Sequence, residues 1–118
     1  MSYHAIEELT LHEGSQSHQV LRTLREQYTS EMQDITRSHV TGKRPSDIQS
    51  LAVSLETVSY VLCQLQHDQA EAVLSKEDVR TGVTQRIRLN YLPTGAFRPP
   101  TEAFPELFDS AWAQLTSV

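Results

Sequence analysis

The chain has 118 residues, of which 38% are apolar, and a net charge of −5; this length predicts one domain with a modest core. Its single cysteine, Cys63, excludes an internal disulfide and favours a reducing compartment. The first thirty residues contain neither a signal-peptide pattern nor an apolar run long enough to span a membrane, so we expect a soluble cytoplasmic protein without membrane contact.

The first regular element that the sequence predicts is a helix over residues 16–39. Apolar side chains recur there at spacings of three and four, which indicates one apolar stripe on a helix; they are Val20, Leu21, Leu24, Tyr28, Met32 and Ile35. Gly14 and Ser15 provide a start, and Gly42 provides a stop. Residues 1–14 carry three acidic residues and no Lys or Arg, and we allow for flexibility in this segment.

A second helix is predicted over residues 46–74. Ser46 can cap it while Gln49 closes a capping box. A heptad-like apolar seam then follows, formed by Leu51, Leu55, Val58, Leu62 and Leu65. The short loop before this helix predicts that the two helices form an antiparallel hairpin. The seam is covered either by the first helix or by a second copy of the chain, which makes these five residues candidates for self-association.

The apolar residues of segment 76–92 fit both the spacing of a helix and the alternation of a strand. Val79, Val83, Ile87 and Tyr91 recur every four residues after a possible cap at Ser75, which favours a third helix. The alternation of apolar and polar residues from Val83 to Tyr91 would also suit a strand, and Gly82 weakens a helix by about 1 kcal/mol. We favour the helix and keep the strand as the alternative.

The C-terminal segment combines an arm with a short helix. Prolines and a glycine predict an extended arm over residues 93–103, and residues 104–118 predict a short amphipathic helix with Pro105 in its first turn. Its apolar face offers anchors for a groove on another protein: Phe104, Leu107, Phe108, Trp112 and Leu115. The alternative is that the same face packs on the chain's own helices as a clasp.

Basic residues gather in one acid-free stretch that contains Arg80, Arg86, Arg88 and Arg98. These arginines could contact phosphates, so a small nucleic-acid-binding module is the alternative function. The net charge of −5 disfavours it, because phosphate affinity comes from clustered positive charge. We favour a solvated face, or an internal match with the acidic C-terminal segment, as the explanation of these arginines.

No residue pattern indicates catalysis. The five histidines lack metal-ligand spacing, and no nucleophile elbow, phosphate loop or dinucleotide loop is present, so we expect no metal site, no cofactor and no enzyme activity. The predicted fold is mainly α: a helical hairpin extended to a small bundle within residues 1–92, then the arm and the C-terminal helix. The predicted function is binding of another protein as an adaptor, assembly factor, inhibitor or chaperone, with a homodimer as a further possibility.

Overall fold

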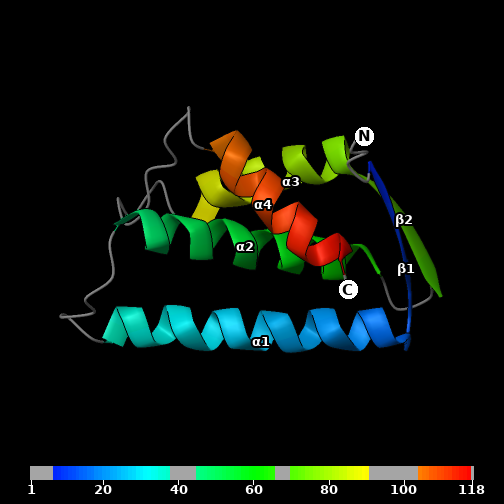
Figure 1. Ribbon diagram of the computed structural model, residues 1–118, viewed down its shortest axis with the longest axis horizontal. Coiled ribbons are helices and arrows are strands. Elements are labelled where there is room, and N and C mark those ends of the chain that lie inside the picture. The colour runs from blue at the N-terminus through cyan, green and yellow to red at the C-terminus, as the bar shows by residue number, and fades with distance from the viewer. Residues whose placement is uncertain (1–6, 38–44, 66–69, 91–103, 118) are drawn as a thin grey trace, which may run out of the picture.

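The computed structural model describes residues 7–37, 45–65, 70–90 and 104–117, which form four helices and two strands (Figure 1). Along the chain these elements are β1 (Glu8–His12), α1 (Gln16–Arg37), α2 (Pro45–Gln64), β2 (Glu71–Ser75), α3 (Lys76–Asn90) and α4 (Phe104–Thr116). The prediction of a mainly helical bundle is confirmed. The arm expected over residues 93–103 lies outside the described residues.

The bundle is built around α2. This helix packs against α1, α3 and α4, and α1 runs antiparallel beside it as the predicted hairpin (Figure 1). The strands β1 and β2 pair at the end of the bundle where α1 begins and α2 ends. No described helix is both long enough and apolar enough to cross a lipid bilayer.

Local hydrogen bonds fix the start of α1. Gly14 has a φ of +76°, a left-handed conformation that glycine adopts without strain. The next residue, Ser15, caps the helix, since its Oγ accepts a hydrogen bond from the His18 N–H at 3.1 Å. The His18 side chain reaches back, and its Nδ1 accepts a hydrogen bond from the Gly14 N–H at 2.9 Å. The turn after β1 thereby leads directly into α1.

The expected continuation of the second helix to residue 74 is wrong. The helix ends at Gln64, and residues Glu71–Ser75 form β2, which pairs antiparallel with β1. In β2, Ala72 and Leu74 are buried while Glu71 and Val73 are exposed, which is the alternation of a half-buried strand. Ala72 fits both the apolar seam of the predicted helix and the alternation of a strand. The helical spacing therefore led to the wrong prediction for residues 71–74. Nor did the acidic composition of residues 1–14 indicate β1.

The ambiguous segment is helical, as we favoured. Ser75 caps α3, since its Oγ accepts a hydrogen bond from the Asp78 N–H at 3.1 Å. The residues spaced by four, Val79, Val83 and Ile87, are all buried. The packing of this apolar face decides between the two periods that the sequence allowed.

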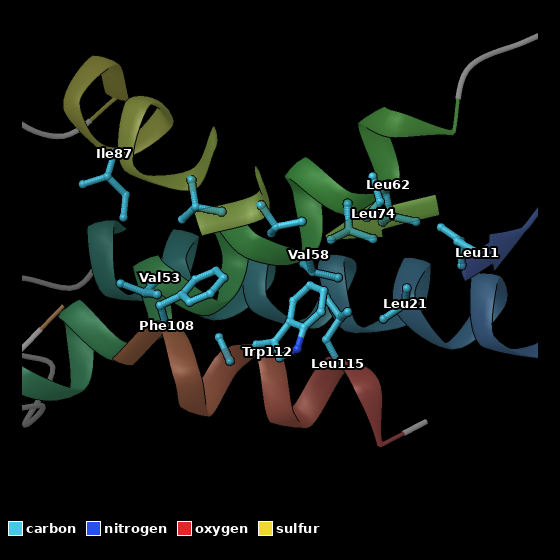
Figure 2. Packing of buried hydrophobic residues seen from close by; sticks show 14 of the residues in the cluster. Leu11, Leu21, Val53, Val58, Leu62, Leu74, Ile87, Phe108, Trp112 and Leu115 are labelled. Carbon is cyan, nitrogen blue, oxygen red and sulfur yellow. The ribbon is translucent and has the colours of Figure 1, made fainter. Parts of the chain in front are cut away.

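The core lies where α2, α3 and α4 meet and extends toward the sheet (Figure 2). Phe108 and Trp112 of α4 point toward Val53 and Val58 of α2 (Figure 2). At the other end, Leu11 of β1 is buried in the same cluster, together with Leu21 of α1 and Leu74 of β2. One continuous apolar core therefore joins both strands to all four described helices.

Candidate functional site

The C-terminal aromatic helix is part of the core. Phe108, Trp112 and Leu115 are 0%, 2% and 3% exposed, and Phe104 and Leu107 are partly buried against the same cluster. The Phe108 and Trp112 rings stack with their centroids 6.3 Å apart. These five residues form a clasp on the chain itself, and they could anchor another protein only if α4 left the core.

An ion pair also ties α4 to α3. Lys76 Nζ lies 3.1 Å from Asp109 Oδ1, and the Lys76 side chain is largely buried. Arg80 of α3 places its guanidinium 5.7 Å from the centroid of the Phe108 ring, within range of a cation–π interaction. The C-terminal helix is therefore held by charge as well as by apolar packing.

The apolar seam of α2 is covered within the chain. Leu51, Val58 and Leu62 are buried, and Leu55 and Leu65 are partly buried. The cover comes from α1, which contributes Leu24, Tyr28 and Met32 to the apolar cluster, and from α4, which also packs on α2. Self-association through this seam stays a prediction, and the seam offers it little exposed apolar surface.

The basic stretch does not form one cationic surface among the described residues. Arg80 is paired with Glu77 at 3.3 Å, in addition to its contact with Phe108. Arg86 Nε donates a hydrogen bond to Oε1 of the buried Glu56 at 2.8 Å. Arg88 is exposed, and Arg98 lies outside the described residues. Internal pairing therefore accounts for two of the four arginines.

A groove that the sequence did not indicate lies between the C-terminal half of α2, the strand β2 and the outer side of α3. Its volume is about 640 Å³, and it is lined by Tyr60, Cys63, Gln64, Val73, Leu74, Asp78, Thr81, Gly82, Gln85, Arg86 and Leu89. Among the described residues, two large apolar side chains are exposed, Val73 at 54% and Leu89 at 76%, and both line this groove. The two exposed large apolar side chains of the described residues therefore lie at one site, which we call the α2–β2–α3 groove.

The floor of this groove depends on Gly82. A Cβ atom at this position would overlap the Tyr60 ring, so the ring packs directly against the backbone of α3. The Gln64 side chain on the same wall donates a hydrogen bond to the Tyr60 carbonyl oxygen at 3.4 Å. A glycine inside a helix costs about 1 kcal/mol, and here the close approach of an aromatic ring provides the physical reason for it.

The described lining residues of the groove include one thiol and two charged side chains, which belong to Cys63, Asp78 and Arg86. Cys63 is exposed and lines the groove, and the described lining residues contain no histidine. Asp78 has no ion-pair partner among the described residues, whereas Arg86 is engaged with Glu56. In the part of the chain that the structure describes, no group of His, Cys, Asp and Glu side chains is arranged to hold a metal ion.

The sequence contained only a partial signal for this site. The alternation of residues 71–75 could have indicated β2 and an outward-facing Val73. The exposure of Leu89 had no such signal, because it depends on how α3 is rotated against α2. Comparison of the chain with known protein families, with curated proteins and with solved structures found no match. Function therefore has to be inferred from the groove and its surroundings.

Proposed function

We propose that this chain is a non-catalytic protein-binding module that holds another protein in the α2–β2–α3 groove. The observation that carries the proposal is the position of Val73 and Leu89, the two exposed large apolar side chains among the described residues, on the same groove. A single exposed leucine is common on protein surfaces. Two such residues around a hollow with polar margins are typical of a surface that is covered by a partner.

The side chains around the groove suit recognition of a protein. Tyr60 contributes a partly buried aromatic side chain to the lining, and tyrosine often contributes strongly to binding energy at interfaces. Polar side chains such as Gln85 and Thr81 lie on the α3 side and can orient the bound group. The groove therefore combines apolar and polar side chains in its lining.

In this proposal α4 supports the binding site instead of forming it. By packing on α2 and pairing with Lys76 at the start of α3, α4 holds together two of the three elements that line the groove. A preorganised groove loses less entropy when a partner binds. The role remains that of an adaptor, assembly factor, inhibitor or chaperone, with the contact surface moved from α4 to the groove.

The test is capture of partners from a lysate of the source organism with three immobilised proteins: the unaltered chain, Leu89→Glu and Gln27→Glu. Leu89 and Gln27 are both exposed, so neither substitution should change the melting temperature. Gln27 lies on α1, outside the groove. We expect at least one protein that the unaltered chain and Gln27→Glu retain and that Leu89→Glu loses, and we expect the purified protein to bind Leu89→Glu at least about tenfold more weakly.

The proposal is wrong if every captured protein binds Leu89→Glu as well as it binds the unaltered chain. A second groove variant, Tyr60→Ala, is then compared to confirm that outcome at the floor of the groove. A partner that is insensitive to both substitutions binds elsewhere on the chain.

A further inference from the structure

We propose that the partner enters the groove as an extended segment that pairs with the outer edge of β2 and becomes the third strand of the sheet. This inference rests on the proposed function and specifies how the groove recognises its partner. Addition of a strand to an exposed sheet edge is a common mode of peptide recognition, in which main-chain hydrogen bonds supply affinity and pockets for alternate side chains supply specificity.

The first argument is the direction of the main-chain groups of β2. Two hydrogen bonds flank the pairing of β1 with β2, from the Glu13 N–H to the Ala70 oxygen at 2.9 Å and from the Lys76 N–H to the Glu7 oxygen at 2.7 Å. In an antiparallel ladder the hydrogen-bonded pairs recur at every second residue. Ala72 and Leu74 therefore direct their N–H and C=O groups toward β1.

The main-chain groups of Glu71 and Val73 consequently point to the opposite edge. The sheet consists of β1 and β2 alone among the described residues, so no described strand lies along that edge. Ser75, the next residue of this set, caps α3 and therefore belongs to the helix start. The edge that is open to a partner is short and centred on Val73.

The second argument is that the groove between α2 and α3 reaches β2. Both Val73 and Leu74 line the groove, and their side chains point to opposite faces of the sheet. We infer that the groove borders the edge of β2, because a groove on one face of the sheet would contact only one of these side chains. None of the residues of β1 lines it. The groove therefore reaches the outer edge of β2, and Tyr60 and Gly82 are among its other lining residues.

The third argument concerns the chemistry of the segment. Its side chains would alternate between the sheet face that carries Val73 and the apolar floor near Tyr60, so apolar residues are expected at every second position. Asp78 on the rim lacks an ion-pair partner among the described residues, which favours a Lys or Arg in the segment. The partner is an extended segment with alternating apolar residues and at least one basic residue.

A second copy of this chain fits the edge less well. Pairing of two β2 edges would bring two chains together that each carry a net charge of −5, and each would present an Asp78 without an ion-pair partner among the described residues. A basic segment of another protein would be attracted by this negative charge, whereas a second copy of the chain would be repelled by it. Charge complementarity therefore assigns the edge to a foreign segment.

The decisive variant is Val73→Pro, and its matched control is Thr10→Pro. Val73 and Thr10 are direct cross-strand partners, and both direct their N–H groups away from the ladder. Proline is tolerated where an edge strand's N–H faces solvent, so each substitution should leave the pairing of β1 with β2 intact. Val73→Pro closes the edge next to the groove, whereas Thr10→Pro closes the other edge of the sheet.

The probes are peptides selected from a random library on the full chain. We expect the selected peptides to contain alternating apolar residues with a basic neighbour. They should bind Val73→Pro at least about tenfold more weakly than they bind the unaltered chain, and Thr10→Pro with an affinity within about twofold of the unaltered one. Hydrogen exchange adds a second readout: the Glu71 and Val73 amides should exchange rapidly in the free chain and become protected by the peptide. N-methylation of alternate peptide amides tests the same hydrogen bonds without altering the protein, should Val73→Pro fail to fold.

Each contrary outcome has a distinct meaning. Some peptides could bind Leu89→Glu weakly but Val73→Pro normally, or carry apolar anchors at every third or fourth residue. Such peptides would support binding in the groove but contradict strand addition at β2. A dimer of the unaltered chain that Val73→Pro converts to a monomer identifies a second copy as the occupant and overturns the foreign segment. If no selected peptide distinguishes Val73→Pro from Thr10→Pro, the proposed strand addition is wrong. If the captured partners are also insensitive to Leu89→Glu, the proposed function is wrong as well.

Discussion

Replacing Trp112 by Ala tests whether α4 belongs to the core or is a detachable anchor. Trp112 is the single tryptophan of the chain, is 2% exposed, and stacks on Phe108 with an interplanar angle of 25°. If α4 is a clasp, its loss weakens the whole fold. If α4 normally projects into solvent, the same substitution leaves the fold unchanged.

The expected magnitude follows from the buried surface. A tryptophan buries about 200 Å², which at about 25 cal/mol per Å² corresponds to about 5 kcal/mol as an upper value. Substitutions of buried aromatic residues by alanine typically cost about 3–5 kcal/mol. We therefore expect the free energy of unfolding to fall by about 4 kcal/mol, against a total of about 5–15 kcal/mol for a domain.

The assay is urea unfolding followed by far-ultraviolet circular dichroism, since the variant lacks the fluorescent residue. With a denaturant dependence of about 2 kcal/mol per M, the midpoint should shift down by about 2 M. Ser110→Ala, an exposed position on the same helix, is the control and should shift the midpoint by less than about 0.3 M. A Trp112→Ala midpoint that matches the control would refute the burial of α4, as would emission of the native tryptophan at the wavelength of the unfolded chain.

Three further predictions concern the interior. Arg86→Met removes a charged partner of the buried Glu56 and should lower the free energy of unfolding by about 2 kcal/mol in chemical denaturation. An unchanged midpoint would show that Glu56 is stabilised without Arg86. Gly82→Ala should fail to deliver the roughly 1 kcal/mol that alanine normally adds to a helix, and thermal melting should instead show a loss, because the new Cβ overlaps the aromatic ring of α2. Burial, and then the charge of Glu31, raises the pKa of Tyr28 above its ordinary value. The unfolded state therefore ionises first as pH rises above about 10, and stability falls up to the folded pKa. In ultraviolet titration, the tyrosine signal that Tyr28→Phe removes should titrate above the ordinary tyrosine pKa.

Local sequence signals were sufficient for most of the helices. The predicted start of α1 after Ser15, the cap of α3 at Ser75 and the apolar face of α4 are each set by hydrogen bonds or spacings within a few residues. Such signals are readable because capping and a helical period act over one or two turns. They predicted the bundle and also showed which faces of it must be covered.

Tertiary contacts decided the rest. The strands Glu8–His12 and Glu71–Ser75 are five residues each and far apart in the chain, so their alternation becomes meaningful only when they pair. An apolar stripe such as that of α4 shows that a face must be buried, yet the same stripe fits a partner's groove or the chain's own core. The groove depends on how α3 rotates against α2, which places Gly82 on Tyr60 and leaves Leu89 exposed. The spacing of apolar residues is a local property, so the sequence determines which residues must be buried. Which surface buries them depends on packing between segments that are distant in the chain.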